Sequence, residues 1–236
     1  MRILNKMREA IKSTGLHRPV RKLVSASYRR QYALIEQLIK DIDLRGFERI
    51  RQKHSSSLDN SRKYLNLDWH LAEVVHLGSK LGLLDSSQQH ILDLGCGSGC
   101  FLFTLKTVGH EVLGVDLSDT PLYNDMVQLL GIPRLVHRVE ALRPLPDFGK
   151  PFDIITAFSI CFDLHWTDTV WGVKEWMFFL DDCRSRLRPG GRIFLNFNPA
   201  TQQEFDFVPD EVAEMLRQMP GGSLSDSKEY FTLIKS

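Results

Sequence analysis

Residues 91–99 read Ile91-Leu92-Asp93-Leu94-Gly95-Cys96-Gly97-Ser98-Gly99, an apolar strand that runs into a loop with a glycine at every second position. A helical pattern begins at once with Cys100. Glycine is required where the backbone takes a positive φ or lies against a ligand with no Cβ in between. In an open α/β sheet, the loop after the first strand lies at the topological switch point, where ligands bind. The stretch therefore predicts an α/β fold with a ligand-binding loop at residues 95–99.

Short β-branched runs alternate with helical runs around this loop. We expect strands at His90–Leu94, Glu111–Asp116, Arg134–Val139, Phe152–Phe158, Arg192–Asn196 and, as a last edge strand, Tyr230–Ile234. We expect helices at Asp68–Lys80, Cys100–Thr107, Ser118–Leu130, Trp171–Arg188 and Pro209–Met219. Near-continuous apolar strands separated by helices indicate a mostly parallel sheet with both faces covered. Because crossovers are nearly always right-handed, the predicted architecture is a doubly wound α/β sheet.

A carboxylate follows the second expected strand, which ends in Gly114-Val115-Asp116, seventeen residues after Gly99. At this position a carboxylate can accept hydrogen bonds from both hydroxyls of a ribose. The alternative is that Asp116 only caps the helix that follows Ser118. Together with the glycine loop, Asp116 indicates a nucleoside site.

The loop spacing distinguishes between nucleosides. A dinucleotide site has the pattern G-x-G-x-x-G, whereas this loop has G-x-G-x-G and Cys100 follows it. Asp93, two residues before the loop, would repel a pyrophosphate but suits the amino group of a methionine moiety. These features favour S-adenosyl-L-methionine (SAM) over NAD, although they would also fit a tight strand–helix turn that has lost its ligand.

Three segments resemble motifs of the class I (Rossmann-like) SAM-dependent methyltransferases. Leu92–Gly99 is similar to their first motif, Gly114–Asp116 to their ribose-binding motif, and Leu187–Ile193 to the turn into their fifth strand. The resemblance covers roughly residues 68–200, in order and at the expected intervals. It implies a Rossmann-like fold, SAM as cofactor and S-adenosyl-L-homocysteine (SAH) as product.

The resemblance also implies roles for individual residues. The methionine and ribose moieties would be lined by Asp93, Gly95, Cys96, Gly97 and Gly99. The ribose hydroxyls would bind Asp116, the adenine would lie against Leu117, Glu140, Ala141 and Leu142, and the sulfonium would lie above Phe158.

Two departures from the family pattern concern the acceptor side. The family usually ends in two antiparallel strands, yet only one is recognisable here, so we expect a sheet of six or seven strands. With six, the acceptor side would be open or completed by the N-terminal segment. In addition, Ala157–Cys161 lacks the Asn/Asp-Pro-Pro-Tyr element of adenine and glutamine N-methyltransferases, which makes those acceptors unfavourable.

The candidate catalytic residue is His165, which follows the fourth expected strand. A histidine with a near-neutral pKa is suited to remove the proton from a hydroxyl or amine acceptor, and Asp163 could orient it. The alternative is a solvent-exposed loop histidine. Asn196 and Asn198 could bind an acceptor or only the turn, and Tyr64 or Trp69 could close over SAM. Aromatic and apolar residues at helical spacing are more often core, and we assign to packing Trp176, Phe179 and Leu180.

The N-terminal segment has a distinct charge. Residues 1–30 contain nine Lys/Arg and one Glu, so they carry +8, whereas the remaining 206 residues carry −7. We predict a basic helical arm or cap at residues 1–67, with a helix from Tyr28 to Ile42 interrupted soon after by Gly46, and a methyltransferase domain at 68–236. The arm could cap the acceptor site, contact an anionic membrane, bind RNA phosphates or be an organellar transit peptide.

The remaining composition is that of an ordinary globular chain, with 43% apolar and 25% charged residues. No apolar run reaches membrane-spanning length, the N-terminus lacks a signal core, and the four cysteines have no metal-ligand spacing. We therefore expect no metal and a cytoplasmic protein, peripheral to the membrane if the arm binds lipid. The predicted function is methyl transfer from SAM to an oxygen or nitrogen of a small-molecule or glycan/lipid-linked acceptor. The alternatives are an RNA methyltransferase and a SAM-fold binding or regulatory protein without turnover.

Overall fold

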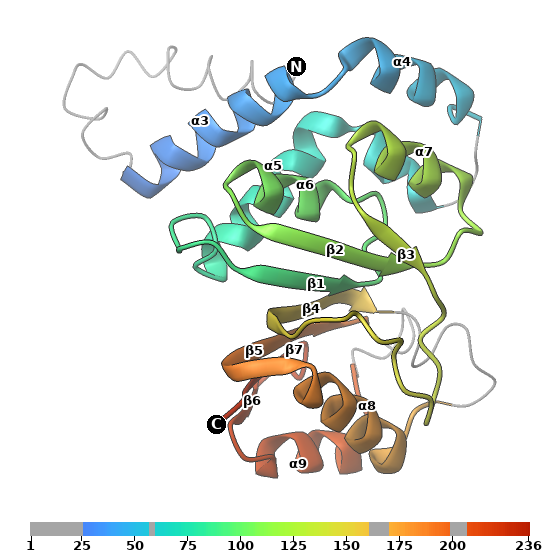
Figure 1. Ribbon diagram of the computed structural model, residues 1–236. Helices are drawn as coiled ribbons and strands as arrows, with labels where there is room; N and C mark the ends of the chain where they lie inside the picture. The colour runs from blue at the N-terminus through green and yellow to red at the C-terminus, as the bar shows by residue number, and fades with distance from the viewer. Residues whose placement is uncertain (1–25, 57–59, 161–169, 199–206) are drawn as a thin grey trace. The chain divides into compact units, whose positions relative to one another are not determined.

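The computed structural model describes residues 26–56, 60–160, 170–198 and 207–236 (Figure 1). Contacts within the chain group these residues into two compact units, which we describe separately. One unit contains all the strands together with two helices. The other contains the remaining helices, including those that follow the first two strands.

The sheet unit contains, among the described residues, a seven-stranded sheet in the order β3-β2-β1-β4-β5-β7-β6. Its strands are β1 (His90–Leu94), β2 (Glu111–Asp116), β3 (Arg134–Val136), β4 (Phe152–Ile160), β5 (Leu187–Phe197), β6 (Gly222–Leu224) and β7 (Tyr230–Ile234). The first five strands are parallel, whereas β7 runs antiparallel to both β5 and β6. Because β2 and β3 extend the sheet from one side of β1 and β4 and β5 from the other, the strand order is the predicted doubly wound one.

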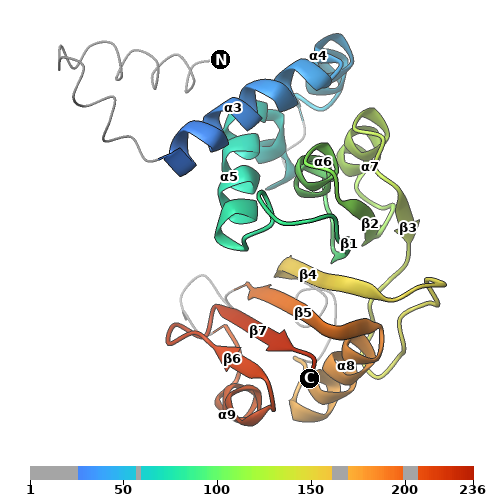
Figure 2. The ribbon, with the colours of Figure 1, turned by 60° about the vertical axis from the view of Figure 1, so that its left-hand side comes forward.

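The core of the sheet unit packs two helices, α8 (Val173–Ser185) and α9 (Asp210–Gln218), with the strands (Figure 2). Trp176 of α8 meets Trp171 and Phe197 edge to face, with ring centroids 5.3 Å apart in both pairs. All three rings are about 1% exposed. The packing role predicted for Trp176, Phe179 and Leu180 is confirmed.

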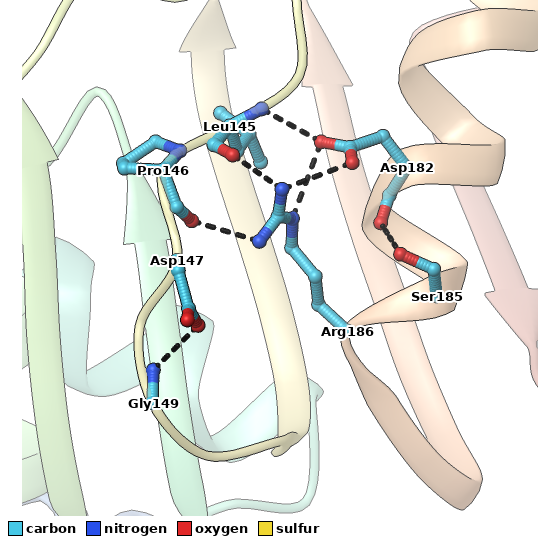
Figure 3. A network of polar contacts seen from close by, with 7 residues as sticks. All are labelled: Leu145, Pro146, Asp147, Gly149, Asp182, Ser185 and Arg186. Carbon is cyan, nitrogen blue, oxygen red and sulfur yellow. Dashed lines mark hydrogen bonds and ion pairs between the residues drawn. The ribbon is translucent and has the colours of Figure 1, made fainter.

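A polar network anchors the segment that leads into β4 (Figure 3). Arg186, the residue that ends α8, donates to the carbonyl oxygens of Leu145 and Pro146 and pairs with Asp182 at 3.0 Å. Asp182 in turn accepts from the Leu145 amide at 2.8 Å. The two charged side chains are only 17% and 14% exposed, so the network fixes this segment to α8 from inside the unit.

The helical unit contains α3 (Ala26–Asp41), α4 (Leu44–Lys53), the 3₁₀ helix η1 (Asn60–Leu65), α5 (Leu67–Lys80), α6 (Cys100–Thr107) and α7 (Pro121–Leu129). Asn66 caps α5 by accepting from the Trp69 amide at 3.4 Å, although we expected Asp68 to begin the helix. Gly82, at φ 70°, ends it, as the Leu83 amide bonds back to the Gly78 carbonyl.

The expected interruption at Gly46 is wrong, since this residue lies inside α4. A Cβ at this position would stand 2.6 Å from Asp43 Oδ2 and 2.7 Å from Leu129 Cδ1. Glycine is therefore present because it allows close packing of α4 with α7. Packing overrides the low helix propensity of glycine here.

Further differences from prediction concern strands, and the helices α7 and α8 are each shorter than expected. The described residues form seven strands, so the six-strand alternative is wrong. β6 has only three residues, too few for a visible alternation. β3 ends at Val136 rather than Val139, because its partner β2 ends at Asp116 and later residues find no register. β5 begins at Leu187 rather than Arg192, since Gly190 and Gly191 exchange backbone hydrogen bonds with Lys235 after β7.

Candidate cofactor site

The glycine loop is hydrogen-bonded to the neighbouring strand where it leaves β1. The amides of Gly95 and Cys96 both donate to the carbonyl of Val115, at 2.7 and 3.2 Å. In the register of the sheet, Asp93 pairs with Gly114 and Leu94 with Val115. The first two sequence motifs therefore lie side by side at the carboxyl ends of β1 and β2.

The glycines of the loop serve two different purposes. Gly95 has φ 79°, and a Cβ built on it would meet no described atom within 4 Å. Gly97 has φ 53°, and its Cβ would meet only the Tyr123 ring, at 4.0 Å. At Gly99, with φ 76°, a Cβ would stand 3.2 Å from Ile132 and 3.3 Å from Val127. The loop is thus open at its first two glycines, where a ligand would lie, and closely packed at the third.

Asp93 is the buried carboxylate of this region, with 4% of its surface exposed. Its Oδ1 accepts a hydrogen bond from the Thr156 hydroxyl on β4 at 2.7 Å. Burial raises the pKa of Asp93 to about 7, the Thr156 hydrogen bond opposes that shift, and the charge of Asp116 adds to it. A cationic amino group would relieve the burial of this charge, so Asp93 fits the ammonium of a methionine moiety.

Asp116 ends β2 and is partly exposed. Its Oδ1 accepts from the Leu117 amide at 2.7 Å. The residue that caps α7 is Thr120, and Pro121 occupies the first turn. The structure therefore does not support the alternative that Asp116 is a helix cap, and the position suits a ribose diol.

Cys96 is 7% exposed, and burial together with the nearby Asp93 and Asp116 raises the pKa of its thiol. A thiol that stays protonated is a poor nucleophile. Cys96 is therefore unsuited to act as a nucleophile in this loop.

The expected adenine segment lies beyond the strand that was predicted to end in it. Because β3 ends at Val136, Glu140, Ala141 and Leu142 belong to the following loop. Leu142 takes φ 56° and is 40% exposed, and Glu140 pairs with Arg143 at 2.7 Å. Phe158, expected near the sulfonium, lies within β4 and is partly buried.

Comparison with known proteins places these residues in a family. Residues 92–193 match the model of a methyltransferase domain. This part of the chain is a methyltransferase domain. The match spans the glycine loop, Asp116 and β4, so the predicted resemblance is confirmed, and SAM is the cofactor of this domain type.

Relatives with curated names include two ubiquinone biosynthesis O-methyltransferases. That of Rhizobium etli is 27% identical over 135 residues, 56% of this chain and 50% of that protein. That of Parvibaculum lavamentivorans is 29% identical over 146 residues, covering 60% and 53%. The chain therefore spans about half the length of the curated relatives it matches. A solved structure, SAM-bound magnesium protoporphyrin IX methyltransferase from Synechocystis PCC 6803, is 18% identical over 81% of this chain and 91% of that chain, with a TM-score of 0.48.

In the helical unit, the methyltransferase loop has a partner that the sequence did not reveal. His70 Nε2 lies 3.2 Å from the hydroxyl of Ser98, whose residue is 2% exposed. Tyr64 meets both His70 and Tyr123 edge to face, with centroids 4.6 and 5.3 Å apart. Burial lowers the pKa of His70 to about 4, with a further contribution from Lys63, so the ring is neutral. A lone histidine in a helical pattern gives no signal of this contact.

Tyr64 and Trp69, which we expected to close over SAM, differ in their surroundings. Tyr64 is partly buried in the cluster with His70 and Tyr123, whereas Trp69 is 37% exposed. Both rings nevertheless lie against His70, which contacts the loop: Tyr64 edge to face, and Trp69 stacked with ring centroids 6.5 Å apart.

Asn196 and Asn198 both contact the backbone at the end of β4. Asn196 Oδ1 accepts from the Ser159 amide at 3.1 Å. Asn198 Nδ2 donates to the carbonyls of Ser159 and Ile160, at 2.8 and 3.0 Å. Of the two roles considered for these residues, binding an acceptor or binding the turn, the structure shows hydrogen bonds to the backbone of the turn.

Several predicted features lie outside the described residues, namely His165, Asp163 and most of the basic arm at residues 1–30. Within the described ranges, no cluster of three or more His, Cys, Asp or Glu side chains could hold a metal ion. In the same ranges, no helix combines the length and the apolar character needed to cross a membrane.

Proposed function

We propose that this protein transfers a methyl group from SAM to an oxygen or nitrogen of a small-molecule or glycan/lipid-linked acceptor. The observation that carries the proposal is the coincidence of the methyltransferase match with an open glycine loop between two carboxylates. Asp93 lies one residue before the end of β1, Asp116 ends the adjacent β2, and the loop that follows β1 is open at Gly95.

When bound, SAM supplies a methyl group already activated on a sulfonium. The chemistry left to the protein is mainly positioning, because holding two reactants in line replaces a bimolecular encounter. Asp93 would hold the ammonium, Gly95 would let the backbone approach the ligand, and Asp116 would hold the ribose hydroxyls. Leu117, the loop at Glu140–Leu142 and Phe158 would provide the surfaces for adenine and sulfonium.

Oxygen is the acceptor atom that the curated relatives favour, since both are named as O-methyltransferases. A hydroxyl acceptor must lose its proton, and His165, oriented by Asp163, is our proposed base. Because the chain matches only half of those proteins, the identity of the acceptor does not transfer with the name.

The experiment incubates the protein with methyl-labelled SAM and a fractionated cell extract. Label in small metabolites or polar lipids would support the proposal. Label in RNA or protein would replace the acceptor class, and SAM binding without label in any fraction would favour a regulatory role. Asp116→Ala should strongly reduce labelling, whereas Asp147→Ala should not, because Asp147 is an exposed turn residue whose described hydrogen bond is with the Gly149 amide.

A further inference from the structure

Ser159 takes a backbone conformation that is unusual for its residue type. Its φ is +50°, in the left-handed region, although Ser159 is the penultimate residue of strand β4. Side chains with a Cβ disfavour this region, and such residues persist only where the surrounding structure enforces them. An extended serine would have continued the strand without strain.

Two carboxamides enforce the conformation, Asn196 on the neighbouring strand β5 and Asn198 directly after that strand. Asn196 accepts the Ser159 amide hydrogen, and Asn198 donates to the carbonyls of Ser159 and Ile160. The register shifts here, since Phe158 pairs with Asn196 but Ile160 already pairs with Phe197. Ser159 is therefore the extra residue of a bulge, and its backbone amide and carbonyl are both bonded by side chains.

The two carboxamides have opposite roles. Asn196 acts as an acceptor toward Ser159, and its Nδ2 donates to Glu229 Oε1 at 3.3 Å, a contact that favours this orientation of the amide. Asn198 acts as a donor to two carbonyls. A carboxylate at position 198 would have the same shape but would face two carbonyl oxygens with no hydrogen to donate.

We propose that Asn196 and Asn198 are positioning residues that hold Ser159 in the left-handed conformation and thereby set the adjacent Phe158 for the cofactor. The proposal rests on the proposed function, in which Phe158 lies near the sulfonium. Ligands of parallel sheets bind at the carboxyl ends of the strands, and β4 bulges at that end. Bulges commonly re-aim a side chain next to an active site.

The test is calorimetric titration of variants with SAH. Some variants remove the hydrogen bonds that hold Ser159 in the left-handed conformation, and others replace Ser159 with glycine, which adopts that conformation without strain. Asn198→Ala and Asn198→Asp should raise the dissociation constant by about fivefold to tenfold, because an unenforced serine relaxes toward extended backbone. Adding Ser159→Gly to Asn198→Ala should restore affinity to within about twofold, since glycine takes positive φ without strain. Ser159→Val, with both carboxamides intact, should reproduce the loss, because a β-branched residue opposes this conformation.

Lys228→Gly is the matched control for relief of strain. Lys228 has φ 58° in the same unit and lies outside the candidate site, so this change should not restore SAH binding to the Asn198→Ala variant. If Asn198→Ala does not fold, the comparison of Ser159→Val with Ser159→Gly tests the same conformation.

The outcomes separate the two proposals. A wild-type chain that does not bind SAH would overturn the proposed function. A wild-type chain that binds SAH, with the Asn198 or Ser159→Val variants binding equally well, would overturn the positioning role. Loss of binding that Ser159→Gly fails to rescue, or that Lys228→Gly rescues equally, would also overturn it.

Discussion

The hydroxyl of Thr156 donates to Oδ1 of Asp93 at 2.7 Å, between two buried residues paired across β4 and β1. This bond stabilises the charged form of a carboxylate whose pKa burial raises to about 7. The charge on which ammonium binding would depend is therefore supported by a residue of the neighbouring strand β4.

Thr156→Val should raise the pKa of Asp93 further above 7, because a hydrogen bond that favours the anion is lost. SAH affinity in the wild type should fall as the pH drops through about 7, as Asp93 takes up a proton. In the variant, the same fall should begin at a higher pH. Titration calorimetry between pH 6 and 9 measures the shift of the midpoint.

Thr104→Val is the control, since Thr104 is equally buried but donates to the Cys100 carbonyl rather than to a carboxylate. It should leave the midpoint unchanged. An identical midpoint in wild type and Thr156→Val would contradict the assignment.

In the ligand-free protein the folded pKa of Asp93 exceeds its unfolded value of about 3.9. Its contribution to the free energy of unfolding is therefore full below about pH 4 and is lost as the pH rises through 7.

Asp116→Ala should weaken SAM binding by about 1.5–3 kcal/mol for each charge-assisted hydrogen bond lost to the ribose. The reason is that Asp116 is partly exposed, ends β2 and does not cap α7. Titration calorimetry with SAM and with NAD measures the effect, and wild type should bind SAM but not NAD. Unchanged SAM affinity in the variant, or tighter binding of NAD than SAM in wild type, would refute the ribose role or the cofactor assignment respectively.

Gly95→Ala should impair SAH binding more than it impairs stability. The added methyl meets no described atom, so the expected loss of about 1–2 kcal/mol in unfolding free energy comes from the left-handed backbone alone. The same methyl would stand where the ligand approaches the loop. Chemical denaturation measures the first effect and calorimetry the second.

Gly149→Ala offers a matched comparison, as Gly149 has φ 75° and an equally open surrounding. It should lose similar stability while binding SAH normally. Gly99→Ala should behave differently again, because its methyl would press on Ile132 and Val127 and destabilise the fold itself. Equal binding by the Gly95 and Gly149 variants would mean that the ligand does not approach Gly95.

The elements predicted best are those that combine a clear hydrophobic pattern with residues that mark where the element ends. β1, β2 and α6 have their predicted bounds, because apolar strands and the glycines at 95–99 delimit them. β6 could not be predicted from three residues, and the extent of β5 depends on backbone bonds to Lys235, which is distant in sequence. The predicted interruption at Gly46 failed for a related reason, since close packing against Leu129, which is distant in sequence, places this glycine inside a helix.

The candidate site shows the same division. Asp93, the glycines and Asp116 could be chosen because a cofactor motif fixes their spacing along the chain. The contact of His70 with Ser98, and of Asn198 with Ser159, joins residues 28 and 39 positions apart and has no sequence signature. Such contacts depend on the register of strands and the facing of helices, which only the folded chain specifies.

Arg186→Met should lower the free energy of unfolding by about 3–5 kcal/mol, as expected when one partner of a buried ion pair is removed. The variant would leave Asp182 with its charge 14% exposed and without its cation, and the carbonyls of Leu145 and Pro146 without a donor (Figure 3). Methionine keeps most of the side-chain volume, so the loss reports polar contacts rather than a cavity. Urea denaturation measures the change.

Arg143→Met is the matched control on the same segment, because Arg143 pairs with Glu140 at 2.7 Å but the two side chains are 71% and 40% exposed. Exposed pairs contribute only about 0–1 kcal/mol, so this variant should be nearly as stable as wild type. Adding Asp182→Asn to Arg186→Met should recover part of the loss by removing the unpaired charge while keeping an acceptor for the Leu145 amide. Equal effects of the two arginine variants would show that the Arg186 network does not anchor the segment leading into β4.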